Sequence, residues 1–175
     1  MTVTEALAEI KTIAKRVEKK KEFIITHIAR TDAVRDPLQN DGGAPAVIRS
    51  ERQSISDLWD RLVSIRVAIA DANAKTSIAI GGVTRTVAEW IVWRRDVSKH
   101  VQAFLGGLRS CVEQARNEAK KRGSSLSETG TGNANDIIVN VSERELLNDI
   151  ETTELVLGEL DGRLSLHNAT THVVV

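Results

Sequence analysis

The sequence contains no tyrosine, three tryptophans and two phenylalanines, so aromatic residues make up only 3% of its 175 residues. Few rings leave little surface on which nucleic-acid bases could stack. The single cysteine, Cys111, excludes an intrachain disulfide, and no cysteine pair suggests a zinc cluster. The core must therefore be aliphatic, and a reducing compartment suits this composition.

An excess of one charge and long apolar runs are also missing. Lysine plus arginine and aspartate plus glutamate number 24 each, so no formal net charge attracts nucleic acid or an anionic membrane. No run approaches the roughly 18 apolar residues of a membrane span, and the N-terminus lacks the basic and then apolar order of a signal peptide. We therefore expect a soluble, unprocessed protein.

Two long segments carry apolar residues at every third or fourth position. This rhythm keeps one side of a helix apolar and is typical of helices that pack lengthwise. We expect helices over 2–30, opened by the capping-box pair Thr2 and Glu5, and over 46–73. The predicted stripes are Val3, Leu7, Ile10, Ala14, Val17, Lys21, Ile24 and Ile28 in the first helix, and Ile48, Glu51, Ile55, Leu58, Leu62, Ile65, Ile69 and Ala72 in the second.

The residues between these helices, 31–45, include both prolines and a Gly-Gly pair, which favour a loop. Such a loop lets the second helix return antiparallel to the first. Lys21 and Glu51 carry charge within the two stripes, where polar residues fix register. We therefore expect them to meet as a partly buried ion pair.

A β-hairpin is expected over 76–86, because β-branched residues flank a Gly-Gly pair that can supply the positive φ angles of a two-residue turn. Thr86 and Glu89 repeat the capping-box spacing and open a third helix that continues to about Arg122.

Gly106 and Gly107 lie inside this third helix, where each costs roughly 1 kcal/mol relative to alanine, and they indicate a close crossing or a kink. Cys111 is expected to be a core residue, not a nucleophile, because no neighbouring base is evident. The predicted stripe contains Val87, Trp90, Arg94, Val97, Val101, Phe104, Leu108, Cys111 and Ala115, widened by Ile91, Leu105 and Val112.

The polar stretch 123–135 is expected to be a flexible linker. A strand over 136–141 follows, and then a fourth helix from Ser142 to about Gly162. A last strand, 171–175, is expected to pair with the 136–141 strand or with a neighbouring subunit.

These patterns predict a mainly α protein, an elongated helical hairpin or bundle with a small β-hairpin and C-terminal strands. Three parts are expected. They are a long-helix bundle over 1–122 that includes the hairpin at 76–86, the linker 123–135, and a strand-helix-strand interaction segment over 136–175.

No constellation of residues points to catalysis. The four histidines are too scattered to bind a metal together, and no glycine-rich phosphate loop is present. The carboxylates Asp57, Asp60, Glu89 and Asp96 have no neighbour that suggests acid-base chemistry. We therefore expect no enzymatic activity, cofactor or metal. A basic cluster on the first helix is interleaved with glutamates, which favours a solvated face; it contains Lys11, Lys15, Arg16, Lys19, Lys20 and Lys21.

Surfaces left for partners are expected at the hairpin tip, on the off-stripe side of the third helix and in the apolar tail. The candidate interaction residues are Ile78, Ile80, Trp93, Val173, Val174 and Val175.

The segment 68–76 (AIADANAKT), continuing through 83–89 (VTRTVAE) to 94–96 (RRD), resembles the middle of the septicolysin-like family. In that family a long helix passes through a short hairpin and re-enters a helix with a basic-acidic pair. The resemblance implies an elongated helical protein with a β-hairpin tip. The whole layout, including the ending 162–171 (GRLSLHNATT), is similar to small accessory proteins encoded among the structural genes of tailed bacteriophages.

The expected function is that of a non-enzymatic structural or assembly protein that self-associates within a tailed-phage particle, as a capsid-associated or head-tail accessory component. It would reside in the virion or the cytoplasm of the bacterial host. Its partners would be copies of itself and other virion or assembly proteins. The alternative is a coiled-coil regulatory or nucleic-acid-associated module that uses the basic face of the first helix, and a membrane-active toxin is a third hypothesis.

Overall fold

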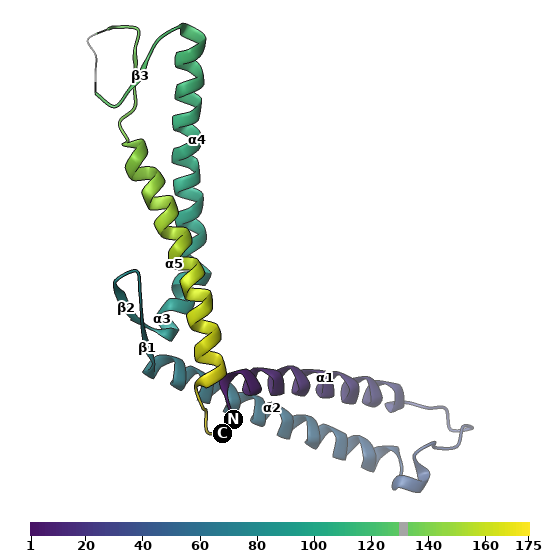
Figure 1. Cartoon of the computed structure of the whole chain (residues 1–175). Coiled ribbons are helices and arrows are strands. Elements are labelled where there is room, and N and C mark those ends of the chain that lie inside the picture. The colour runs from purple at the N-terminus through teal and green to yellow at the C-terminus, as the bar shows by residue number, and fades with distance from the viewer. Residues whose placement is uncertain (130–132) are drawn as a thin grey trace. The chain divides into compact units, whose positions relative to one another are not determined.

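The computed structural model describes residues 1–129 and 133–175, and helices dominate it (Figure 1). The predicted mainly α class is confirmed. The chain forms two compact units: unit 1 comprises Met1–Lys75 and Leu166–Val175, and unit 2 comprises Thr76–Ser165. These units do not follow the predicted division at 122 and 135, because the C-terminal residues belong to unit 1 and the β-hairpin belongs to unit 2.

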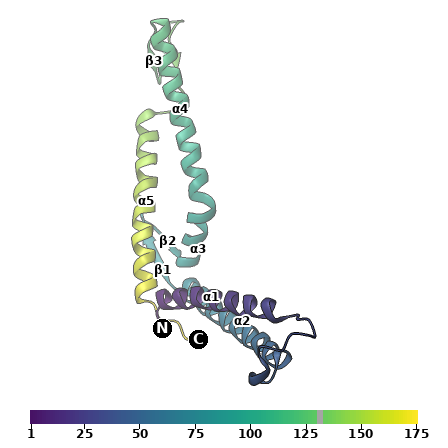
Figure 2. The same cartoon turned by 90° about the vertical axis from the view of Figure 1, so that its right-hand side faces the viewer.

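Unit 1 is built on two antiparallel helices, α1 (Val3–His27) and α2 (Ala44–Lys75), which lie side by side in Figures 1 and 2. The predicted capping box of α1 is present. The Glu5 amide donates to the Thr2 hydroxyl over 3.2 Å, and the Thr2 amide donates to the Glu5 carboxylate over 2.7 Å.

The loop between these helices contains a turn of 3-10 helix, η1 (Gln39–Asp41), and is closed by Asp36. The Asp36 carboxylate accepts the backbone amides of Ala44 (2.8 Å) and Leu38 (2.9 Å), and so caps the first turn of α2. These two bonds, that of Ala44 most strongly, hold the pKa of Asp36 below its ordinary value.

The predicted stripe of α2 agrees with the burial along that helix, whereas the stripe of α1 is wrong at alternate positions. Ala6 and Ile13 are buried, while Leu7 and Ala14 are exposed. A shift of one residue rotates a side chain by about 100°, so the seam faces a different side at these positions. The residues of α1 that pack in the seam are Val3, Ala6, Ile10, Ile13, Val17 and Ile24.

The same shift corrects the predicted ion pair. Lys20, not Lys21, reaches Glu51, with 2.6 Å between Nζ and Oε2 and each side chain about three-quarters buried. Lys21 bonds instead to Glu18 on its own helix. A second pair joins Arg61 Nε to Glu9 over 2.9 Å. Because low numbers on α1 meet high numbers on α2, both pairs mark the antiparallel register.

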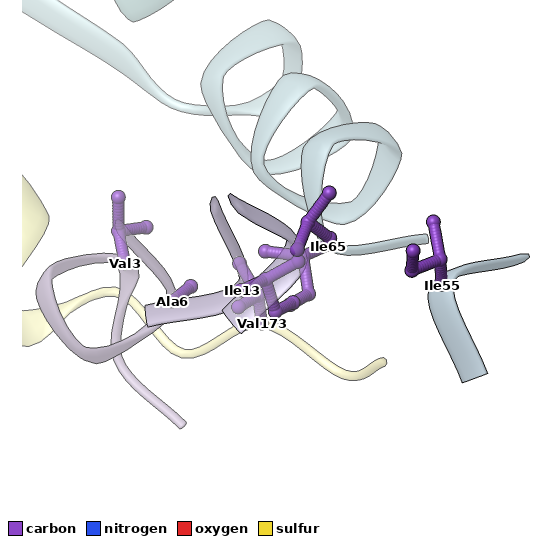
Figure 3. Packing of buried hydrophobic residues seen from close by; sticks show 7 residues of the cluster. Val3, Ala6, Ile13, Ile55, Ile65 and Val173 are labelled. Atoms are coloured by element: carbon purple, nitrogen blue, oxygen red, sulfur yellow. The ribbon is translucent and has the colours of Figure 1, made fainter. Parts of the chain in front are cut away.

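The predicted helix end at Gly162 and the predicted pairing of 171–175 with 136–141 are wrong, while pairing with a neighbouring subunit stays a prediction. The last helix, α5 (Glu143–Thr170), continues through Gly162, and residues 171–175 form no strand with 136–141. His172 instead makes a β-bridge with Thr2, and the Val173 amide donates to the carbonyl of Met1 over 2.8 Å. Val173 is buried in the same cluster as Ile13 and Ile65 (Figure 3).

The predicted end of α5 at Gly162 is wrong because a glycine inside a helix costs less than the burial of its neighbours contributes. Glycine costs roughly 1 kcal/mol in a helix, whereas burying a leucine side chain contributes roughly 1.5–3 kcal/mol. Leu160 and Leu164 lie on both sides of Gly162 and are both buried. Their burial outweighs the cost of the glycine, so the helix continues.

Unit 2 begins with the predicted β-hairpin, formed by β1 (Ser77–Ile80) and β2 (Val83–Thr86). Gly81 and Gly82 form its turn with φ angles of 54° and 78°. The capping box of Thr86 and Glu89 opens α3 (Val87–Val92) directly after β2. Trp90 then donates its indole N–H to the carbonyl of Ile78 over 3.1 Å, which ties the helix to the hairpin.

The predicted third helix is interrupted, but not at its glycines. A π-helical segment, η2 (Trp93–Val97), separates α3 from α4 (Ser98–Arg122), and α4 runs through Gly106 and Gly107 unbroken. A π-helical turn takes up an extra residue, which rotates the side chains of α4 by about 100° relative to those of α3. As a result the off-register residues Phe104 and Cys111 are exposed, so the prediction that Cys111 is a core residue is wrong.

Helix α5 packs along α4. Leu146 and Ile150 of α5 cluster with Leu105 and Val112 of α4, and Glu143 pairs with Arg116. The predicted strand 136–141 is reduced to β4 (Ile137–Ile138), which pairs in parallel with β3 (Leu126–Ser127) inside the predicted linker. Residues 130–132 of that linker lie outside the described residues.

We expect Gly106→Ala to raise the free energy of unfolding by about 0.5–1 kcal/mol, because alanine favours the helix and a Cβ at this position meets no atom within 4 Å. Gly81→Ala is the contrasting variant, since its φ is 54° and its Cβ would lie 3.1 Å from Val156. Urea unfolding followed by circular dichroism measures both. Destabilisation by Gly106→Ala would show that α4 needs this glycine.

Candidate interaction surfaces

The predicted interaction residues fall into two places. Ile78, Ile80 and Trp93 belong to one cluster around Trp90 in unit 2, where Ile80 is only 1% exposed. The rings of Trp93 and Trp90 meet edge to face with centroids 5.6 Å apart. These side chains hold the hairpin on its own unit, so little of their surface remains for a partner.

The tail residues divide in the same way. Val173 is buried within unit 1, whereas Val174 is 95% exposed and Val175 is 42% exposed. A partner could contact the last two side chains without disturbing the core.

A larger apolar surface lies on α2, where the sequence reading assigned no role. Trp59, Val63 and Val67 are 54%, 57% and 63% exposed. Positions i, i+4 and i+8 fall within about 80° of the helix circumference, so the three side chains form one row, which we call the α2 stripe. In the sequence this row is visible as a second set of apolar residues four positions apart, next to those of the buried seam.

Arginines accompany the α2 stripe. Arg49 and Arg52 line a shallow open hollow of about 610 Å³ together with Trp59. Arg66 follows one turn beyond Val63 and is exposed. Within the described residues none of the three arginines has a carboxylate at salt-bridge distance. This face therefore combines apolar contact area with uncompensated positive charge.

A comparable row of opposite charge lies on α5. Leu147 and Leu155 are 52% and 67% exposed, and Glu151 lies between them on the same side of the helix. Glu154 borders the row and is exposed. In the part of the chain that the structure describes, neither glutamate has an ion-pair partner. We call these four residues the α5 stripe.

The basic cluster of α1 is only partly compensated. Lys20 and Lys21 are paired with Glu51 and Glu18. Lys11, Lys15 and Lys19 form an exposed row at i, i+4 and i+8, and no carboxylate among residues 1–129 and 133–175 lies at salt-bridge distance from them. The interleaved glutamates thus neutralise less of this face than their spacing suggested.

Two of the carboxylates considered for acid-base chemistry have structural partners. The Thr86 amide and hydroxyl lower the pKa of Glu89, and the Arg95 guanidinium lowers the pKa of Asp96. Both groups are therefore held as anions. Among the described residues, no three His, Cys, Asp or Glu side chains gather in a way that could hold a metal ion. No described helix is both long and apolar enough to cross a bilayer.

His167 is a buried histidine of unit 1. It is 5% exposed, with Nε2 2.9 Å from the side-chain oxygen Oδ1 of Asn73 and Nδ1 3.0 Å from the Thr171 hydroxyl. A neutral ring meets both partners when Nε2 donates and Nδ1 accepts. Burial lowers the pKa of His167. The Thr171 carbonyl accepts the Val3 amide over 3.0 Å, so this group helps to attach the C-terminal segment to α1.

Comparison of the chain with protein-family models, with curated proteins and with solved structures found no match. The resemblances to the septicolysin-like family and to phage accessory proteins therefore rest on the sequence patterns alone.

We expect the free energy of unfolding to decrease as the pH falls below about 6.5, the ordinary pKa of histidine, because the unfolded chain binds the proton more readily than buried His167. His167→Gln should remove this part of the pH dependence. Urea unfolding at pH 7.5, 6.5 and 5.5 measures it. The other three histidines remain in both proteins, so an unchanged pH dependence in the variant would contradict the assignment to His167.

Proposed function

We propose that this chain is a non-enzymatic structural or assembly protein that self-associates through its helix faces, as an accessory component of a tailed-phage particle. The observation that carries the proposal is the α2 stripe. Three large apolar side chains in one row, each more than half exposed, exceed the scattered apolar residues of an ordinary monomer surface.

A comparison of the free energy of burial with the cost of association favours an extended interface over a small one. Burying three such side chains contributes roughly 5–8 kcal/mol, whereas association costs about 4–15 kcal/mol in lost translational and rotational freedom. The stripe therefore needs further contacts around it, and the neighbouring arginines are the nearest groups that can provide them.

The phage context rests on the layout of the whole chain and its similarity to small accessory proteins of tailed phages. Such proteins work by surface contact, which agrees with long helices whose outer faces carry apolar rows. A portal or major capsid gene beside the gene for this chain would support this part of the proposal.

We expect the full-length chain to form oligomers in light scattering, and Val63→Asp to weaken their association by at least about tenfold, because a charge replaces a buried apolar contact. Val34→Asp is the matched control, since Val34 is 54% exposed in the α1–α2 loop and lies off the stripe. A wild-type chain that stays monomeric at high micromolar concentration would refute self-association.

A second candidate function is a nucleic-acid-associated module that uses the lysine row of α1. The uncompensated charges of Lys11, Lys15 and Lys19 favour it, because cations along one helix row can contact successive phosphates.

For this second candidate we expect DNA retention that weakens steeply with salt and is lost when the three lysines are changed to glutamine. Filter binding at 50 and 200 mM salt measures it. Lys99→Gln, a change at an exposed lysine of α4, is the control. Retention that is insensitive to salt or to the three substitutions would remove this candidate.

A further inference from the structure

We propose that the α2 stripe of one copy binds the α5 stripe of a second copy, so that the chain assembles head to tail through two different faces. This inference rests on the proposed self-association and names the surfaces that carry it.

The apolar rows match in length. Trp59 and Val67 lie eight positions apart on α2, as Leu147 and Leu155 do on α5. Eight residues of α-helix rise about 12 Å, so each pair of apolar side chains spans the same distance along its helix. The row of one helix can therefore lie along the row of the other with an apolar contact at each end.

The charges of the two faces are complementary. Arg52 and Arg66 border the α2 stripe, and Glu151 and Glu154 belong to the α5 stripe. Within the described chain these four side chains have no ion-pair partner. When Trp59 lies beside Leu147 and Val67 beside Leu155, Arg66 lies level with Glu154 and can pair with it, whereas Arg52 lies about 10 Å before the row and adds positive charge at its end. Beside the stripes, Asp60 on α2 and Arg144 on α5 carry the reverse charges and offer a further complementary pair. Two copies of either stripe would instead bring like charges together.

Contact between two different faces has a consequence for the assembly. Each copy retains one unused α2 stripe and one unused α5 stripe after a first contact, so association continues until a ring closes or a chain grows. The size of the assembly should therefore increase with protein concentration instead of stopping at a two-fold dimer.

Charge reversal tests the pairing. Arg52→Glu with Arg66→Glu should weaken self-association by about a hundredfold, because it places a carboxylate at position 66 opposite Glu154 and makes the end of the α2 stripe acidic. Glu151→Arg with Glu154→Arg should do the same by placing basic groups opposite Arg66. All four side chains are exposed, so circular dichroism should show unchanged helix content. An equimolar mixture of the two variants should assemble again in light scattering, because every α2 stripe then meets an α5 stripe of opposite charge.

The control is Lys15→Glu with Lys19→Glu, which changes the net charge as much as the arginine variant but lies on α1. It should assemble like the wild type on its own. Addition of the α5 variant should shorten these assemblies, because that variant binds the last free α5 stripe through its own α2 stripe and then offers only a basic α5 stripe to the next α2 stripe. If this control dissociates as the arginine variant does, or if the two stripe variants stay monomeric when mixed, the pairing is overturned. If both stripe variants assemble like the wild type, the pairing is overturned but the proposed self-association stands. If the wild type is itself monomeric, the proposed function is overturned as well.

Discussion

Unit 1 depends on a continuous aliphatic seam between α1 and α2. Isoleucine and valine side chains such as Ile13, Val17 and Ile65 exclude water along it, and their burial is non-directional. Such a seam holds two helices together but distinguishes poorly between alternative alignments. The ion pairs Lys20–Glu51 and Glu9–Arg61 select one alignment of the two helices, since each pair forms only in one register. Val173 packs in the same cluster and its amide donates to the Met1 carbonyl, which joins the C-terminal segment to the first helix.

In unit 2, the connected helices α3 and α4 pack against two different elements, the β-hairpin and α5. Trp90 packs on the hairpin cluster and donates to Ile78, and α4 must then present Leu105 and Val112 to α5. In a regular helix Leu105 and Phe104 would lie at similar angles on either side of Trp90, so the helix alone would not decide which of them faces α5. The π-helical segment Trp93–Val97 rotates α4 relative to α3, so that Leu105 faces α5 and both clusters form along one connected helix.

The faces that remain after these seams are formed are the basis of the proposed assembly function. The α2 stripe and the α5 stripe lie off the buried seams, and their substitution would alter few contacts within either unit. The sequence reading placed the interaction surface at the hairpin and the tail. The sequence shows no packing partner for those segments, whereas in the structure Ile80 and Val173 are buried by residues far away in the chain.

The sequence alone determined the features that depend on near neighbours: the capping boxes at Thr2 and Thr86, the Gly81-Gly82 turn, and the buried seam of α2 that contains Ile55 and Ile65. Each follows from interactions within a few residues, which local patterns record. Only the tertiary structure decided which of Ala6 or Leu7 faces α2, that Lys20 and not Lys21 meets Glu51, and that α5 passes through Gly162. Those outcomes depend on where a distant segment lies, because burial against that segment outweighs both residue hydrophobicity and helix propensity.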